Sequence, residues 1–250
     1  MNLLKAEISK TLIEIKTYYP DHIVDIVIKY FLFTAFFIGF GSKNINPDSF
    51  LLGYSFWMIA SYIISEASVQ ISFEKQVGTV EQLFIKPFSS SSLLAVRSIL
   101  LFVVSIAKFV LLFLIISLTM RIHISLPASI FVVYFFSILG FLGLGIFLSS
   151  LTLIFTKTAS FESIISYGLL IVSGVIVPFG NLPQILHKIL LPIPYFYGIE
   201  MAQKLGSMQT VSFSEWIFLV LLNIAALGLS FFLYEIVLKY VRKRGLINKY

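Results

Sequence analysis

The sequence predicts an all-α membrane protein with six transmembrane helices, and three observations support this fold class. Apolar residues make up 58% of the 250 and charged residues only 12%, whereas soluble domains carry about 25% charged residues. Six apolar segments come close to, or exceed, the roughly twenty residues that a helix needs to cross a bilayer. A polar, amphipathic stretch at residues 73–88 separates the second segment from the third.

The expected elements follow one another along the chain with short polar connections. Residues 1–20 show an apolar helical stripe flanked by lysines and glutamates, which is typical of a helix lying flat in a membrane interface. The first span is polar at its start, where Asp25 and Lys29 lie, so its exact beginning is uncertain. The expected spans are residues 23–41, 50–71, 92–119, 128–155, 161–179 and 214–238.

Residues 181–213 contain Pro183, Pro192 and Pro194 and are too irregular to span. We expect one or two short re-entrant helices here that enter the outer leaflet, with an ordinary interfacial loop as the alternative. Most of the 18 Lys and Arg residues fall in connections on one side of the expected spans. The positive-inside rule then places both termini and residues 73–88 in the cytoplasm and the protein in the cell membrane.

Residues 73–88 have the pattern of an amphipathic helix at the membrane surface. Phe73, Val77, Val80 and Phe84 share one face at spacings of three or four residues. Pro87 prevents the helix from continuing, and four serines after it offer capping hydroxyls to the next helix. From the pattern alone, this segment is either a docking helix or a simple connection.

Seven residues between Glu74 and Ser89 carry a family resemblance. Their order, E-x-x-x-G-T-x-E-x-L-x-x-x-P-x-S, resembles the signature of type 2 ABC transporter permeases. In that family the segment is a cytoplasmic coupling helix that docks into a separate ATPase subunit. The resemblance implies one permease domain over residues 1–250, two ATPase subunits that bind Mg-ATP, and a homodimer of the permease. The implied coupling residues are Glu74, Gly78, Thr79, Glu81, Leu83 and Pro87.

The chain shows no catalytic, cofactor or metal motif of its own. It contains no G-x-x-x-x-G-K-[ST] loop and no Cys, and its three His lie in separate segments. Gly140, Gly143 and Gly145 lie inside an apolar span at the wrong spacing for a nucleotide fingerprint, so they are expected to serve helix packing. We therefore expect a transport subunit rather than an enzyme, with the bilayer and no nucleic acid as a partner.

Three charged residues within the expected spans are candidate gate or pathway residues. Glu66 and Arg97 lie at similar depths in adjacent spans, which predicts an ion pair that is either a gate or a static link. Lys108 lies near the middle of its span, where a lysine costs roughly 3 kcal/mol. It should therefore face a cavity, a dimer interface or an acidic substrate group, and Glu66 is not an obvious partner for it.

These features favour an ATP-driven exporter of a hydrophobic or amphipathic substrate, such as a drug, a lipid or a peptide. Export of a lipid-linked polysaccharide is the alternative that the same resemblance allows. An ion-coupled carrier should show inverted repeats and paired charges at mid-membrane, and only Lys108 hints at that class. A membrane enzyme would need a nucleophile with a base, or metal ligands, at one depth.

Overall fold

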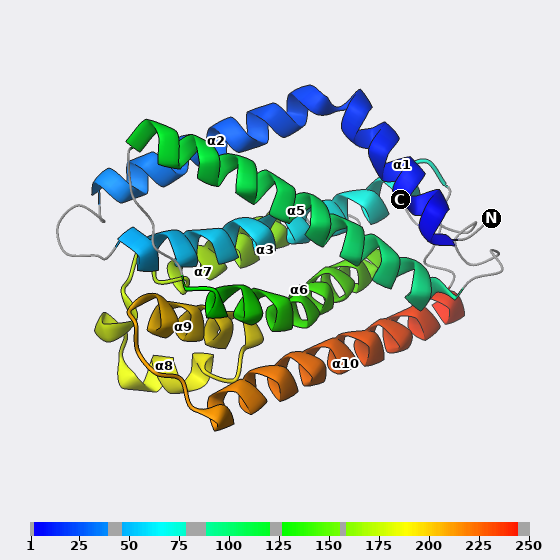
Figure 1. Ribbon diagram of the computed structural model, residues 1–250. Helices are drawn as coiled ribbons and strands as arrows, with labels where there is room; N and C mark the ends of the chain where they lie inside the picture. The colour runs from blue at the N-terminus through cyan, green and yellow to red at the C-terminus, as the bar shows by residue number, and fades with distance from the viewer. Residues whose placement is uncertain (1–2, 40–46, 79–88, 121–126, 156–158, 245–250) are drawn as a thin grey trace.

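The computed structural model describes residues 3–39, 47–78, 89–120, 127–155 and 159–244. These residues form nine α-helices and no strand (Figure 1), which agrees with the all-α class. In chain order they are α1 (Leu3–Thr17), α2 (Tyr19–Gly39), α3 (Pro47–Gln76), α5 (Ser90–Met120), α6 (Ser129–Ile154), α7 (Ala159–Ile171), α8 (Gln184–Leu190), α9 (Pro194–Gly206) and α10 (Phe213–Arg244), with a 3₁₀ turn at Phe179–Asn181.

Five of the described helices, α2, α3, α5, α6 and α10, are long and apolar enough to cross a membrane. Four of them begin or end within a few residues of the expected spans, whereas α2 starts at Tyr19 rather than at residue 23. Pro20 lies in the first turn of α2, where proline loses no helical hydrogen bond, so it begins this helix as well as following α1. Ser89 Oγ accepts the backbone N–H of Ser92 at 3.1 Å and caps α5.

The expected span at residues 161–179 is shorter than predicted. Helix α7 has 13 residues and ends at Ile171, after which the chain turns. Gly174 has a φ of +80°, a left-handed conformation that glycine adopts readily and that stops a helix. Gly53 of α3 packs so closely against this turn that a Cβ there would collide with the carbonyl oxygen of Ser173. A sixth crossing by this region therefore stays a prediction.

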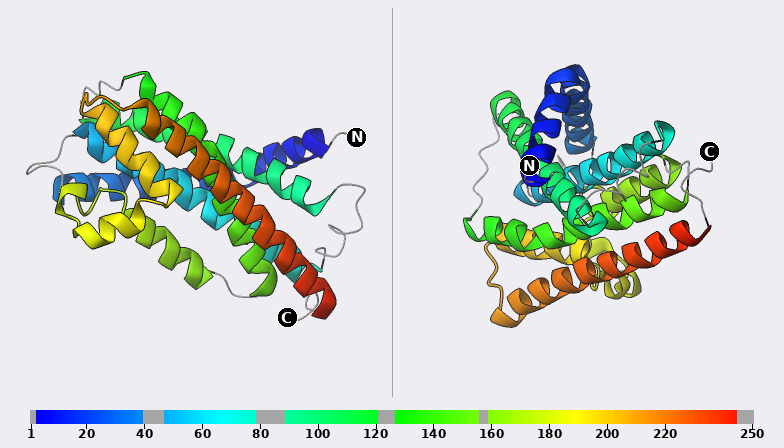
Figure 2. Two further views of the ribbon diagram at one scale, coloured as in Figure 1. Left: turned by 90° about the horizontal axis from the view of Figure 1, so that it is seen from below. Right: turned by 90° about the vertical axis from the view of Figure 1, so that its right-hand side faces the viewer.

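Helix α3 is the centre of the bundle. It packs against α5, α6, α7 and α9, and 89% of its most apolar stretch is buried. Helices α1 and α2 lie along one side of the bundle and α10 along the opposite side (Figure 1). The beginning of α1 and the end of α10 lie at the same end of the bundle, and α8 and α9 lie at the other (Figure 2).

Glycines on α6 bring neighbouring helices close, as the sequence predicts. The N–H of Gly140 donates to Asn223 Oδ1 of α10 at 3.0 Å, and both groups are buried. A Cβ at Gly143 would lie 3.1 Å from Ser230 Oγ of α10, and one at Gly145 would lie 3.0 Å from Ile63 of α3. Packing therefore accounts for these glycines.

The region before the last helix forms two short helices, α8 and α9. One or two short helices were predicted here. Helix α9 packs against α3, α6 and α10 and buries most of its length. Helix α8 has no buried residue and exposes Ile185 and Ile189. Helix α9 is thus covered by protein, whereas Pro192 and Ile193 before it are exposed. Entry of these helices into the outer leaflet remains a prediction.

Candidate functional site

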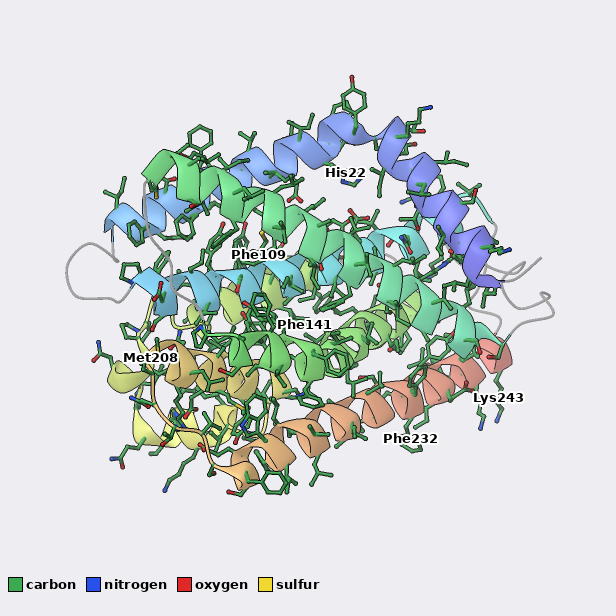
Figure 3. All side chains as sticks on the ribbon, viewed as in Figure 1. His22, Phe109, Phe141, Met208, Phe232 and Lys243 are labelled. Carbon is green, nitrogen blue, oxygen red and sulfur yellow. The ribbon has the colours of Figure 1, made fainter. Side chains whose placement is uncertain are left out.

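A cavity of about 940 Å³ lies between α1, α2, α3, α5 and α7. Its lining follows α3 from Trp57 to Glu74, a distance of about 25 Å at 1.5 Å per residue. His22 lies on the side of α2 that faces the bundle (Figure 3) and also lines the cavity. The cavity is highly charged for a bundle of apolar helices. Its ionisable lining residues, apart from histidine and tyrosine, are Lys10, Glu14, Asp21, Asp25, Lys29, Glu66, Glu74, Lys108 and Glu162.

One carboxylate on α2 holds two lysines at the wall of this cavity. Lys108 Nζ of α5 lies 2.8 Å from Asp25 Oδ2, and Lys29 Nζ lies 3.1 Å from Asp25 Oδ1. Lys108 Nζ is also 3.9 Å from the centre of the Tyr62 ring, a geometry that stabilises a cation electrostatically. The charges at the start of α2, which made its beginning uncertain in the sequence, are therefore part of an ion-paired cluster.

Lys108 lines the cavity, which is one of the three surroundings expected of it, and a pathway role stays a prediction. Its partner Asp25 was missed by sequence reasoning. Asp25 and Lys29 stand one helical turn apart in an apolar stretch of the sequence, and Lys108 is a third charge within such a stretch. Because unpaired charges in spans are costly, the presence of three charged residues in apolar stretches could have predicted that they pair with one another.

The expected ion pair between Glu66 and Arg97 is wrong. Arg97 Nη2 lies 2.7 Å from Glu74 Oε1, and Arg97 Nε donates to Glu7 Oε2 at 3.2 Å. The reason is the length of α3, which continues to Gln76 and carries Glu74 to the level of Arg97. Glu66 lies eight residues earlier, about 12 Å back along the helix, where it lines the cavity instead.

Arg97 joins three helices through buried charges. Its side chain is 6% exposed, and those of Glu7 on α1 and Glu74 on α3 are 8% and 11% exposed. A guanidinium is well suited to this role because it stays protonated and donates in several directions at once. Glu7 could not be identified from the sequence, since it is one of several charged residues on an amphipathic helix.

The residue after Glu74 fixes the same turn of α3 to α6. Lys75 Nζ donates to the carbonyl oxygens of Thr152 and Leu153 at 3.0 Å and 2.9 Å. These carbonyls lie in the last turn of α6, which a cation stabilises through the helix dipole. The final turn of α3 is therefore tied to α1, α5 and α6.

The expected coupling segment is only partly described. Phe73 to Gln76 complete α3 rather than beginning a separate helix, so Glu74 belongs to the end of that helix. Gly78 follows with a φ of +72°, a conformation that favours glycine. Thr79, Glu81, Leu83 and Pro87 lie outside the described residues.

A second network of charges lies at the opposite end of the bundle. Lys204 of α9 bridges Glu200 at 3.2 Å and Glu215 of α10 at 3.1 Å, and His187 Nε2 lies 3.1 Å from Glu200 Oε2. Burial lowers the pKa of Lys204, but its hydrogen bonds to Glu215 and Glu200 outweigh burial and raise that pKa above the ordinary value. This network holds α8, α9 and α10 together and lines no described cavity.

A comparison of the sequence with models of known protein families gives a match that extends from α1 into α9. The family model described as "ABC-2 type transporter" matches residues 3–205. No curated protein and no solved structure matches the chain. The matched residues include the cavity and the whole of residues 73–88. The chain belongs to the ABC-2 type transporter family and is the membrane-spanning permease of an ABC transporter.

Proposed function

We propose that this permease is the membrane subunit of an exporter that moves a hydrophobic or amphipathic substrate out of the cell. Two copies would form a homodimer in the cell membrane, with each copy docked on a separate ATPase subunit that holds Mg-ATP. The observation that carries this proposal is the cavity of about 940 Å³, whose lining extends to Glu74 at the end of α3. A drug-sized cargo fits such a volume.

The position of this cavity along the bundle supports the proposed direction of transport. Residues 73–88 are expected in the cytoplasm by the distribution of Lys and Arg. The cavity lining includes Phe73 and Glu74, which lead into that segment, and Lys10 and Glu14 of the interfacial helix. A cargo would therefore load from the cytoplasm or from the inner leaflet, as export requires.

Coupling would act through the final turn of α3. In the proposal, closure of the two ATPase subunits displaces residues 73–88, which contain Glu74, Gly78, Thr79, Glu81, Leu83 and Pro87. Because buried ion pairs and hydrogen bonds tie this turn to three other helices, its displacement would move α5 and α6 with it. The bridge from Lys108 to Asp25 joins α5 to α2, so movement of α5 would reshape the cavity wall.

The chain is suited to a direct test of this topology because it contains no Cys. Two single-cysteine variants can be compared. Gln82→Cys introduces a thiol into the proposed coupling segment. Met208→Cys introduces one just beyond α9, where the native side chain is 72% exposed. In intact cells a membrane-impermeant maleimide should label Met208→Cys only, and Gln82→Cys should react after the membrane is permeabilised. Labelling of Gln82→Cys in intact cells would place the segment outside and end the proposal.

Coupling itself is tested by ATP hydrolysis in vesicles that contain the permease and its ATPase. Glu81→Lys and Gly78→Trp should reduce permease-dependent hydrolysis at least tenfold, about 1.4 kcal/mol, because they change the charge and the space at the docking surface. Lys188→Glu, on the exposed helix α8 at the other end, is the matched control and should hydrolyse ATP normally. Normal hydrolysis by both docking variants would refute the coupling role.

A further inference from the structure

We infer that the cavity takes an amphipathic organic cation and that Glu66 is the carboxylate that receives its positive charge. This inference rests on the proposed function, because it names the substrate class of the same cavity. It is carried by the pairing of the charged side chains in the cavity, by the aromatic residues among them, and by the balance of charge in its lining.

The lysines of the cavity are already paired. Lys29 and Lys108 share Asp25, and Lys10 bridges Glu14 on α1 at 3.6 Å. By contrast, Glu66 makes no ion pair or hydrogen bond with any residue that the structure describes, although it faces the cavity. Lys108 and Lys29 attract Glu66 electrostatically but form no hydrogen bond or ion pair with it, and a half-buried carboxylate without such a direct partner is costly. A cationic ligand would remove that cost.

Aromatic residues flank Glu66 along the cavity. Tyr62 lies one helical turn away, and Lys108 Nζ lies 3.9 Å from the centre of its ring. This aromatic face already carries a cation, which shows that the wall can stabilise one. Trp57 is held in place because its Nε1–H donates to the carbonyl oxygen of Ser166 on α7 at 2.9 Å. Tyr167 and Phe73 complete an apolar lining for the hydrophobic part of the cargo.

The charge of the lining disfavours an anionic cargo. Six carboxylates and three lysines face the cavity. Lys29 and Lys108 share one carboxylate and Arg97 pairs with Glu74, so carboxylates remain in excess. A phosphate or carboxylate group would meet like charge without a free lysine to bind, which is a repulsion that works against the wrong class of ligand. An amphipathic cation would meet both a carboxylate and aromatic surface.

Two probes of nearly the same size and opposite charge test this assignment. Tetraphenylphosphonium is a permanent hydrophobic cation, and tetraphenylborate is its anionic counterpart. The chain has two Trp, so Trp216→Phe leaves Trp57, which lines the cavity, as the reporter of binding in purified, detergent-solubilised permease. The saturable quenching of Trp57 should give a Kd at least tenfold lower for the cation than for the anion.

Variants at Glu66 then assign the charge. In the Trp216→Phe background, Glu66→Gln should raise the Kd for tetraphenylphosphonium about tenfold, which corresponds to 1.4 kcal/mol. Glu66→Asp keeps the charge and should stay within about threefold, roughly 0.7 kcal/mol. Equal affinity for the two probes, tighter binding of the anion, or an unchanged Kd in Glu66→Gln would each overturn the inference.

The same preparation separates this inference from the proposed function. If the permease supports ATP hydrolysis but prefers tetraphenylborate, the export proposal stands and the cation assignment fails. If tetraphenylphosphonium binding depends on Glu66 but vesicles never accumulate the probe on addition of ATP, the cation site stands and the export proposal fails.

Discussion

Replacing Arg97 with Met should destabilise the permease strongly. The side chain of Met is of similar length and apolar, so the change removes the charge with little loss of volume. It leaves Glu7 and Glu74, which are 8% and 11% exposed, as two carboxylates without the cation that lies between them. Removing one partner from a buried ion pair costs about 3–5 kcal/mol, and this cation serves two carboxylates, so we expect at least the lower value.

Thermal unfolding in detergent, followed by intrinsic fluorescence, measures this cost. For a chain of this size 1 kcal/mol corresponds to about 2–4 °C in Tm, so Arg97→Met should lower Tm by about 10 °C. Adding Glu7→Gln and Glu74→Gln should recover much of the loss, because no buried charge then remains unpaired. Lys188→Met, at an exposed position on α8, serves as the control and should shift Tm by less than about 2 °C.

Two outcomes would refute the reasoning about Arg97. A Tm within about 2 °C of the native value for Arg97→Met would mean that the three-residue cluster carries little energy. A failure of the triple variant to recover stability would mean that the loss comes from packing rather than from unpaired charge.

Three further changes are expected to have defined effects. Lys75→Met removes two hydrogen bonds to α6 and should cost about 1.5–3 kcal/mol, measured as a fall in Tm. Gly53→Val has no space against the turn after α7 and should cost at least about 1–3 kcal/mol, seen as loss of monodisperse protein in size-exclusion chromatography, whereas Gly228→Ala, with open space, should not. Because the folded-state pKa of Lys204 is raised, its stabilisation is fully present below about pH 10 and is lost as pH rises through the raised value. A Tm series from pH 8 to about pH 11.5 should therefore fall more steeply for the native chain than for Lys204→Met, and equal slopes would contradict this.

Much of the bundle could be predicted from the sequence, because a long apolar segment in a membrane can satisfy its backbone hydrogen bonds in few ways other than by forming a helix. Helices α3, α5, α6 and α10 follow from that constraint alone. The length of α7 does not, because residues 161–179 are apolar on both sides of Gly174. The turn depends on the left-handed conformation of that glycine and on the close approach of Gly53, a tertiary contact between distant parts of the chain.

The partners of the charged residues, like the length of α7, could not be predicted from the sequence because they depend on tertiary contacts. Lys108 was predicted to face a cavity, a dimer interface or an acidic substrate group, because the cost of burying a charge is local to the residue. Its partner Asp25 was missed, since the pairing depends on how α2 crosses α5. Arg97 was given the wrong partner because matching depths along two helices required the true end of α3, which lies at Gln76 rather than at residue 71. A small error in the predicted end of a helix can therefore assign a side chain to the wrong partner.

Glu7 gives the first helix a mechanical part in the molecule. A chain shortened to begin at Tyr19 would leave Arg97 with only one of its two carboxylates. Helix α1 therefore contributes through Glu7 to the contact between α3 and α5. A fusion ahead of Leu3 would be attached directly to this helix, whereas a fusion after α10 would not.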